Sequence, residues 1–366
     1  MKIYFLIQNL EGGGAERVVV NILNNLNESE FEKELVLIEN RGKYLDTLNK
    51  KIRIKIFSNI LKDRRLNFVL NFFKALTFLF FKKDKDIIFT QYHPGKLLSF
   101  FIPIFFRNEK IIYRETNIPQ EINDVNKNSV KLLDKIFYKY GIKNFTKIIV
   151  QSLDMEKMIL KIDNSLKEKL ILINNPVDIE FIEKKILNQE VRKEKDVVNL
   201  ISIGRLNKQK GYDLLIETLG KMKEKNFILK ILGTGSEEES LKKLVKEKHL
   251  DKKVLFLGFK TNPYKYLINS DFYISSSRFE GFPNAVLEAH ACGIPVIANN
   301  YNGGINEIII SGINGEIIDI VNVKKFITSL EKKYDSEKIK QTVKERYSSK
   351  IIIKKYEDLF KDVRKY

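Results

Sequence analysis

The sequence VVNLISIGRLNKQKG, residues 197–211, joins an apolar run to a loop that contains glycine and two cations. Branched apolar side chains dominate Val197–Ile203, which is typical of a buried β-strand. Arg205 and Lys210 follow this strand closely, five residues apart, beside Gly204. A guanidinium can bind two phosphate oxygens, an ammonium adds a point charge, and glycine lets the backbone approach, so the loop suits a diphosphate. Alone the pattern is not specific, because most cations in surface loops are only solvated.

Short β-branched runs alternate with helix-length amphipathic segments along the rest of the chain, which is the pattern of parallel α/β sheets. The expected strands of the first half are Ile3–Ile7, Glu34–Ile38, Ile52–Phe57, Asp86–Thr90, Lys110–Arg114 and Lys147–Gln151. Those of the second half are Val197–Ile203, Phe227–Leu232, Lys253–Leu257, Phe272–Ser275, Pro295–Ala298 and Gly315–Ile318. Six strands in each half, with helical patterns between them, predict two Rossmann-like, doubly wound domains.

Length and composition agree with two globular domains. A chain of 366 residues suits two domains of about 150–200 residues each. Pro176 lies in the polar turn Asn174–Asp178, which is typical of a domain boundary. We therefore expect a first domain over 1–175 and a second over 176–346. The single cysteine, Cys292, excludes an internal disulfide and fits a reducing compartment. The opening MKIYFLIQNL is typical of a strand rather than a signal peptide, and we expect a cytoplasmic protein.

The chain carries 65 Lys and Arg against 47 Asp and Glu, a net charge of +18. This excess would suit nucleic acid, an anionic membrane or phosphate-bearing small molecules. The basic residues are spread along the chain, without an arginine-rich arm, zinc-finger spacing or aromatic RNA-binding signature. We therefore expect no nucleic-acid partner.

A second cluster, SSSRFEGFPNAVLEA at residues 275–289, follows another expected strand. Pro283 suits the first turn of a helix, so Glu280 is expected in the loop and Glu288 inside the helix, both facing the carboxyl end of the sheet. The exposed amides at the start of such a helix would face a phosphate or a developing negative charge. Apolar residues surround both glutamates, which disfavours the alternative that they are two solvated surface charges.

The segment Leu66–Phe81, LNFVLNFFKALTFLFF, is almost wholly apolar and is flanked by Arg64, Arg65, Lys82 and Lys83. Its polar members, Asn67, Asn71, Lys74 and Thr77, form one narrow stripe on a helix. It is too short and too interrupted to span a bilayer. Two interpretations stay open: a buried helix of the first domain, or an interfacial helix that brings residues 64–83 to the inner membrane leaflet. A second apolar run, Leu97–Phe106, favours the latter.

Taken together, the motifs resemble those of the retaining glycosyltransferases of family 4, which have the GT-B fold. The resemblance rests on Gly204–Gly211, Gly233-Thr234-Gly235, the Glu280-x7-Glu288 spacing, Ala291–Val296, Gly303–Glu307 and Gly312–Gly315, which occur in the family's order and cover the second half. In the first half, Gly12–Arg17, His93-Pro94 and Arg114–Asn117 are also similar to the family. The final segment resembles the family's last helix, so residues 347–366 are expected to complete the first domain.

The resemblance implies two Rossmann-like domains that face each other across a cleft. It also implies transfer of a hexose or N-acetylhexosamine from a nucleotide diphosphate donor, a UDP-sugar by preference, to a lipid-linked or polysaccharide acceptor in cell-surface glycan synthesis. The donor-binding residues implied are Gly13, Gly14, Gly204, Arg205, Lys210, Gly233, Gly235, Glu280, Gly281, Phe282, Pro283, Asn284, Ala285 and Glu288.

Within that set, the resemblance gives individual roles. Arg205 and Lys210 would stabilise the leaving diphosphate, Glu280 would contact the donor sugar, and Glu288 would bind the ribose. We assign no nucleophile; His93 or Glu115 would assist acceptor binding, and a structural role for either stays open.

Two other kinds of protein remain alternatives: a nucleotide-sugar 2-epimerase of the same architecture, and a catalytically inactive nucleotide-sugar-binding subunit. An epimerase would be expected to carry several histidines, and the chain has three. The Asp84-Lys85-Asp86 triplet resembles a metal-binding D-x-D, but it precedes a strand in a lysine-rich loop, so we interpret it as solvated charge. We expect neither a metal nor another cofactor.

Overall fold

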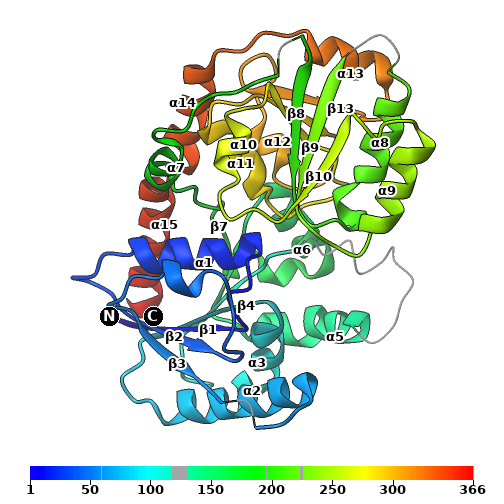
Figure 1. The fold of residues 1–366 in the computed structure, drawn as a ribbon. Coiled ribbons are helices and arrows are strands. Elements are labelled where there is room, and N and C mark those ends of the chain that lie inside the picture. Colours follow the sequence, from blue (N-terminus) through cyan, green and yellow to red (C-terminus); the bar gives the residue numbers. More distant parts are fainter. Residues whose placement is uncertain (59, 118–129, 195, 223–225, 366) are drawn as a thin grey trace. The chain divides into compact units, whose positions relative to one another are not determined.

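The computed structural model describes residues 1–58, 60–117, 130–194, 196–222 and 226–365, shown as the coloured ribbon in Figure 1. The chain divides into two compact units. Unit 1 comprises Met1–Pro176 with Ser349–Tyr366, and unit 2 comprises Val177–Ser348. The chain passes from unit 1 to unit 2 inside the turn Asn174–Asp178.

Unit 1 contains a seven-stranded parallel sheet with the order β3-β2-β1-β4-β5-β6-β7. The strands are β1 (Lys2–Ile7), β2 (Glu32–Leu37), β3 (Arg53–Ile56), β4 (Ile87–Gln91), β5 (Ile111–Arg114), β6 (Lys147–Val150) and β7 (Leu170–Leu172). The helices are α1 (Gly14–Asn25), α2 (Arg64–Phe81), α3 (Tyr92–Phe105), α5 (Val130–Ile136), α6 (Leu153–Ile162) and α15 (Ser349–Lys365). Short helical turns are η1 (Leu45–Thr47), η2 (Phe137–Gly141), η3 (Ile142–Asn144) and η4 (Asn164–Lys169).

Strand side chains in unit 1 alternate between two apolar cores. Ile3 and Phe5 of β1 pack with α1 and the C-terminal helix α15, whereas Tyr4 and Leu6 pack with α2, α3 and α6. This alternation with a period of two is what a sheet covered on both faces requires. Helix α15 is amphipathic, and its Ile352, Tyr356 and Phe360 are buried in the first of these cores.

Unit 2 contains a six-stranded parallel sheet with the order β10-β9-β8-β11-β12-β13. The strands are β8 (Val198–Ile203), β9 (Phe227–Leu232), β10 (Val254–Gly258), β11 (Phe272–Ser275), β12 (Val296–Asn299) and β13 (Gly315–Ile318). The helices are α7 (Ile179–Ile186), α8 (Tyr212–Gly220), α9 (Glu238–Glu247), α10 (Tyr264–Leu267), α11 (Asn284–Ala291), α12 (Ile305–Ile308), α13 (Val323–Leu330) and α14 (Ser336–Tyr347), with the turn η5 (Lys208–Lys210). Helices α8, α9 and α13 cover one face, and α7, α11 and α14 cover the other.

The fold class predicted from the sequence is confirmed: both sheets are parallel and doubly wound, and all twelve expected strands are present within two residues of their expected ends. The analysis missed β7, a strand of three residues at the edge of the first sheet. It lies in the short apolar run Leu170–Ile173, which directly precedes the polar turn at Asn174. The apolar segment expected as a helix is α2.

The strand order reverses once in each sheet, between β1 and β4 in unit 1 and between β8 and β11 in unit 2. The helices that follow the two strands at each reversal cover opposite faces: α1 and α3 in unit 1, α8 and α11 in unit 2. In doubly wound sheets, ligands bind at this point, outside the carboxyl ends of the strands. The loops after β8 and β11 are therefore the first place to look for a site in unit 2.

Helix α11 is anchored in unit 2 by a buried histidine. His290 is fully buried, and its Nε2 donates a hydrogen bond to the carbonyl oxygen of Asn314 at 2.9 Å. Because burial disfavours the charged imidazolium, the pKa of His290 is lowered to about 4. The folded unit therefore holds this histidine neutral at pH values where the unfolded chain would protonate it.

We expect this histidine to make unit 2 acid-sensitive. As the pH falls from about 6.5 to about 4, only the unfolded state gains the proton, so the free energy of unfolding decreases; at about pH 5 the loss relative to about pH 7 is about 2 kcal/mol. Urea unfolding of the wild type and of His290→Gln at these two pH values measures the loss in the free energy of unfolding. The glutamine amide can still donate to Asn314 but does not titrate, so the variant should lack this part of the loss. Equal losses in both proteins would contradict the assignment.

Candidate functional site

Two loops meet at the carboxyl edge of the unit 2 sheet, Gly204–Gly211 after β8 and Ser276–Pro283 after β11. The amide of Arg278 donates to the carbonyl oxygen of Gln209 at 2.8 Å. The Ser276 hydroxyl donates to the carbonyl oxygen of Lys210 at 2.8 Å, and the Gln209 side chain donates to the carbonyl oxygen of Phe279 at 3.1 Å. These bonds fix the two loops against each other at the point where the strand order reverses.

The two loops also share an ion pair between residues predicted for the site. The Lys210 ammonium donates to Oε1 of Glu280 at 2.5 Å, and the Ser277 hydroxyl donates to the same oxygen at 2.7 Å. Both side chains are largely withdrawn from solvent, with 20% of Lys210 and 12% of Glu280 exposed. Partial burial strengthens such a pair relative to one on the open surface. A cation and a carboxylate from loops 70 residues apart therefore lie in direct contact.

Local geometry explains why Lys210 lies there. Asn207 caps the turn η5, with its side-chain oxygen accepting from the amide of Lys210 at 3.2 Å. Gly211 then adopts a left-handed conformation at φ 61°, and a Cβ there would lie 2.1 Å from the carbonyl oxygen of Ser276. Only glycine permits this turn together with such close packing between the loops.

Arg205, the other predicted cation, is exposed. Its side chain forms no hydrogen bond or ion pair with any residue that the structure describes. The site thus combines a cation held by a carboxylate with a cation that has no protein partner among the described residues. Arg205 therefore has no contact with a described residue to break before it binds an anion.

Arg278 contributes a contact that the sequence analysis did not foresee. Its guanidinium binds both carboxylate oxygens of Asp213, at the start of α8, at 2.8 and 2.6 Å, and also donates to the carbonyl oxygen of Lys208. The guanidinium lowers the pKa of Asp213. The pair ties the loop that carries Glu280 to the helix that follows Lys210. The sequence contains no spacing signal for it, because the two residues lie 65 positions apart.

The predicted glycines of the β9 loop pack directly on the β8 loop. A Cβ on Gly233, at φ 140°, would lie 1.9 Å from the carbonyl oxygen of Gly204, and one on Gly235 would lie 2.2 Å from that of Leu206. The amide of Leu206 in turn donates to the carbonyl oxygen of Thr234 at 3.0 Å. These glycines therefore serve close backbone packing beside Arg205, and their predicted role in lining a nucleotide pocket stays a prediction.

Helix α11 begins one residue later than expected. Pro283 is its N-cap rather than part of its first turn, because its ψ of 91° is extended, and Asn284 and Ala285 begin the helix. Phe282 is buried, and the centroid of its ring lies 5.6 Å from that of Tyr347. The carbonyl oxygen of Gly281 accepts a hydrogen bond from the amide of Gly304 at 3.1 Å. Glu288 lies on α11 and is 6% exposed, far more enclosed than a solvated surface glutamate.

Two buried phenols lie within electrostatic reach of Glu280. Burial raises the pKa of Tyr273 and of Tyr301 well above the usual value, and the Glu280 carboxylate raises both further. The Tyr301 and Ser275 hydroxyls are 3.2 Å apart and share a hydrogen bond. Both tyrosines therefore stay neutral beside the ion pair, and neither can act as a base at ordinary pH.

In unit 1, the loops at the reversal of strand order carry the predicted glycines and histidine. Gly12 has a φ of 123°, Gly13 is the N-cap of α1, and Gly14 begins that helix. His93 lies at the start of α3, directly after β4, and is exposed. Desolvation by the surrounding protein, with the ammonium of Lys96, lowers the pKa of His93. Its imidazole is thus predominantly neutral near pH 7.

Glu115 has the environment of a structural carboxylate. It is 1% exposed and accepts hydrogen bonds from the hydroxyl of Tyr138 at 2.5 Å and from the amides of Thr116 and Asn117 at 2.8 and 3.1 Å. The preceding Arg114 is fully buried and donates to Gln91 at 2.8 Å and to Asn175 at 2.5 Å. A role for Glu115 in acceptor binding stays a prediction.

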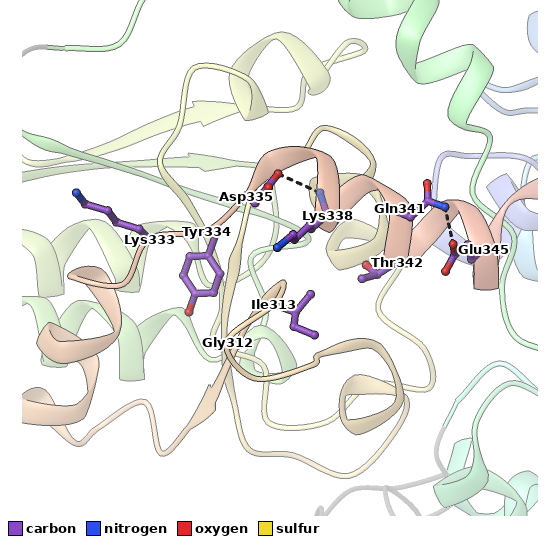
Figure 2. Close-up of a pocket in the computed structure, with 9 residues that line it drawn as sticks. All are labelled: Gly312, Ile313, Lys333, Tyr334, Asp335, Lys338, Gln341, Thr342 and Glu345. Atoms are coloured by element: carbon purple, nitrogen blue, oxygen red, sulfur yellow. Dashed lines mark hydrogen bonds between the residues drawn. The ribbon is translucent and has the colours of Figure 1, made fainter.

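A cavity of about 400 Å³ lies elsewhere in unit 2, beside α14 (Figure 2). It is lined by Gly312, Ile313, Lys333, Tyr334, Asp335, Lys338, Gln341, Thr342 and Glu345, none of them a predicted site residue. The described part of the chain contains no group of three or more His, Cys, Asp and Glu side chains placed to hold a metal ion. The requirement for a metal stays untested by this observation.

The second half of the chain matches a known family model. Residues 183–349 match the family model Glycosyl transferases group 1. Over 359 residues the chain is 29% identical to the N-acetylgalactosamine-N,N'-diacetylbacillosaminyl-diphospho-undecaprenol 4-alpha-N-acetylgalactosaminyltransferase of Campylobacter jejuni, covering 94% of this chain and 93% of that protein. It is also 32% identical over 244 residues to an uncharacterised glycosyltransferase of Methanocaldococcus jannaschii, covering 63% and 59% of the two chains.

Solved structures agree in fold. The Anabaena protein Alr3699/HepE, in complex with UDP and glucose, superposes with a TM-score of 0.78 at 19% identity, with 99% of both chains covered. The lipopolysaccharide outer core galactosyltransferase WaaB superposes with a TM-score of 0.73 at 21% identity, with 98% of both chains covered. The two doubly wound units, the family match over 183–349 and these relatives lead to one conclusion: the chain is a glycosyltransferase of the GT-B type.

Proposed function

We propose that the protein is a retaining, metal-independent glycosyltransferase of family 4. It transfers a hexose or N-acetylhexosamine from a nucleotide diphosphate donor, by preference a UDP-sugar, to a lipid-linked or polysaccharide acceptor in cell-surface glycan synthesis. The observation that carries this proposal is the Lys210–Glu280 ion pair beside Arg205, at the point of unit 2 where doubly wound sheets bind ligands.

The donor diphosphate would bind to the two cations. Arg205 can offer two parallel N–H groups to phosphate oxygens, and Lys210 can turn its ammonium from Glu280 towards the same group. Glu280, released from the ammonium, would then be an acceptor for hydroxyl groups of the donor sugar. The diphosphate thus replaces the Glu280 carboxylate as the partner of Lys210. This exchange needs no large rearrangement of the loops held by Arg278.

Transfer would follow from stabilisation of the leaving group. The acceptor oxygen forms a bond to the anomeric carbon as the bond from that carbon to the diphosphate oxygen breaks, and the acceptor proton passes to the departing phosphate. Negative charge grows on the diphosphate, where Arg205 and Lys210 already lie, so their stabilisation is greater in the transition state than in the ground state.

The acceptor and the place of action complete the proposal. The Campylobacter relative is named for an acceptor on diphospho-undecaprenol, which supports a lipid-linked acceptor here. The enzyme would then work in the cytoplasm, peripherally at the inner membrane, with residues 64–83 in contact with the inner leaflet.

Nucleotide binding tests the donor site directly. A nucleotide present at ~100 times its dissociation constant should stabilise the fold by about 2.7 kcal/mol, a shift of about 5–10 °C for a unit of this size. We expect UDP or a UDP-sugar to give this shift in a thermal-denaturation panel that also contains GDP and ADP. Lys210→Ala should reduce the shift strongly, because it removes a cation from the diphosphate.

The matched control is Lys208→Ala, which removes the same charge from an exposed position of the same turn. This variant should keep the wild-type response. A panel without any shift, or an equal loss in Lys208→Ala and Lys210→Ala, would contradict the assignment of the diphosphate to Lys210.

Catalysis is tested by the product. With an α-linked UDP-sugar and a diphospho-polyprenol-linked acceptor, we expect a new α-linkage, identified by its anomeric NMR coupling. Arg205→Ala should lower kcat on the order of 10²–10³, as loss of one preorganised donor does elsewhere. Slow release of sugar from the donor without acceptor would exclude an inactive binding subunit, whereas a β-linked product would contradict retention.

A further inference from the structure

Helix α2 turns two of its polar side chains, Asn67 and Asn71, into the protein. Asn67 is buried; its side-chain oxygen accepts from the amides of Ile60 and Leu61 at 3.0 and 2.9 Å. Asn71 is fully buried and donates to the carbonyl oxygen of Ile38 at 3.1 Å. Of the four polar side chains in the stripe that the sequence shows, Asn67 and Asn71 therefore bind neighbouring loops, whereas Lys74 is half-buried and Thr77 is exposed.

The opposite stripe of α2 is apolar and exposed. It consists of Leu66, Val69, Phe73, Thr77 and Phe80, spaced by three or four residues, with Phe81 beside its end. Phe73 is 48% exposed and Phe81 is 73% exposed. The only polar member, Thr77, donates its hydroxyl to the carbonyl oxygen of Phe73 at 3.0 Å and so is satisfied within the helix. This orientation is the reverse of an ordinary surface helix, whose outer face is polar.

Helix α3 extends this surface from a second part of the chain. Its Ile104 and Phe105 are 69% and 52% exposed. The ring centroids of Phe101 and Phe73 are 5.7 Å apart, and those of Phe105 and Phe80 are 6.0 Å apart. The two helices therefore share one aromatic surface. Exposed apolar patches made of several such side chains mark sites of interaction with a protein or a membrane.

The charge around this surface selects between those partners. Neither residues 64–83 nor residues 92–107 contain an aspartate or glutamate, whereas Arg64, Arg65, Lys74, Lys82 and Lys83 are all in or beside α2. Arg64 pairs with Glu39 at 3.1 Å, and the two aspartates that adjoin this segment are engaged, Asp63 as the N-cap of α2 and Asp84 with Lys2. Lys62 and Arg65 at one end and Lys82 and Lys83 at the other remain as cations beside the helix. Aromatic and aliphatic side chains bordered by cations are what an anionic lipid surface binds.

We propose that the exposed face of α2 and the end of α3, residues Leu66, Val69, Phe73, Phe80, Phe81, Ile104 and Phe105, are a docking surface for an anionic lipid bilayer. The helices lie in the plane of the membrane, with the aromatic rings at the level of the headgroups and the cations of Arg65, Lys82 and Lys83 on lipid phosphates. This inference rests on the proposed function only in that docking would bring the enzyme to a lipid-linked acceptor in the membrane. No described helix is both long and apolar enough to cross a membrane.

Vesicle sedimentation tests the surface with the whole chain and without donor or acceptor. We expect the protein to sediment with vesicles of equimolar phosphatidylcholine and phosphatidylglycerol, and far less with phosphatidylcholine alone. Phe73→Gln combined with Phe81→Gln should weaken binding on the order of tenfold. Arg65→Gln combined with Lys83→Gln should weaken it about fivefold for each charge removed, and added salt should have the same effect.

The matched control is Leu187→Gln combined with Val191→Gln, two apolar residues of unit 2 that are 68% and 63% exposed. This control should bind vesicles as the wild type does. An unchanged midpoint of thermal unfolding would show that the aromatic variant is folded; Phe81 is largely exposed and Phe73 is about half exposed, so we expect little change.

Three outcomes would overturn the inference: no sedimentation of the wild type, full binding by the aromatic variant, or a dimer in light scattering that this variant dissociates while vesicle binding is absent. The last outcome would assign the surface to a second copy of the chain. The nucleotide thermal shift of the aromatic variant should equal that of the wild type. Vesicle binding without any nucleotide response would leave this inference standing and remove the proposed donor site.

Discussion

The contact that joins the two loops of the proposed donor site is the ion pair between Lys210 and Glu280. It joins the loop after β8 to the loop after β11, and these strands are neighbours although 70 residues separate the two side chains. The pair exists because the strand order reverses at this point, and because Gly211 and Asn207 shape the turn that presents the ammonium. Arg278 also binds Asp213 on α8 and the carbonyl oxygen of Lys208, so the ion pair is not the sole contact that holds the two loops together.

Unit 1 shows how a sequence pattern can have two structural meanings. The polar stripe of α2 could have been its solvent face, yet Asn67 and Asn71 bind backbone groups of adjacent loops, and Phe73, Phe80 and Phe81 lie on the exposed side. An unpaired buried polar group carries a large free-energy cost, so these hydrogen bonds hold the two asparagines on the inner side of the helix. An exposed aromatic surface is the result, and its basic border gives it a preferred partner.

Strands, the fold class and the loop motifs could be predicted from the sequence because they depend on local patterns: β-branched runs such as Val198–Ile203, and glycine beside cations directly after them. Contacts between segments that are distant in the sequence could not be predicted in this way. The pairing of Arg278 with Asp213 and the burial of Glu115 against Tyr138 depend on how strands pair in space. The three-residue strand β7 was missed although the run Leu170–Ile173 around it is wholly apolar, which is itself a strand signal.

The measurement that tests this account most directly is calorimetric titration of UDP into the wild type and into Glu280→Gln, with Glu239→Gln as a control that removes an equal charge from an exposed position of α9. If the diphosphate replaces the Glu280 carboxylate at Lys210, the neutral glutamine competes less, and UDP should bind about fivefold more tightly, the equivalent of ~1 kcal/mol. Glu239→Gln should bind UDP as the wild type does. Unchanged or weaker UDP binding by Glu280→Gln would contradict the exchange of anions at the centre of this site.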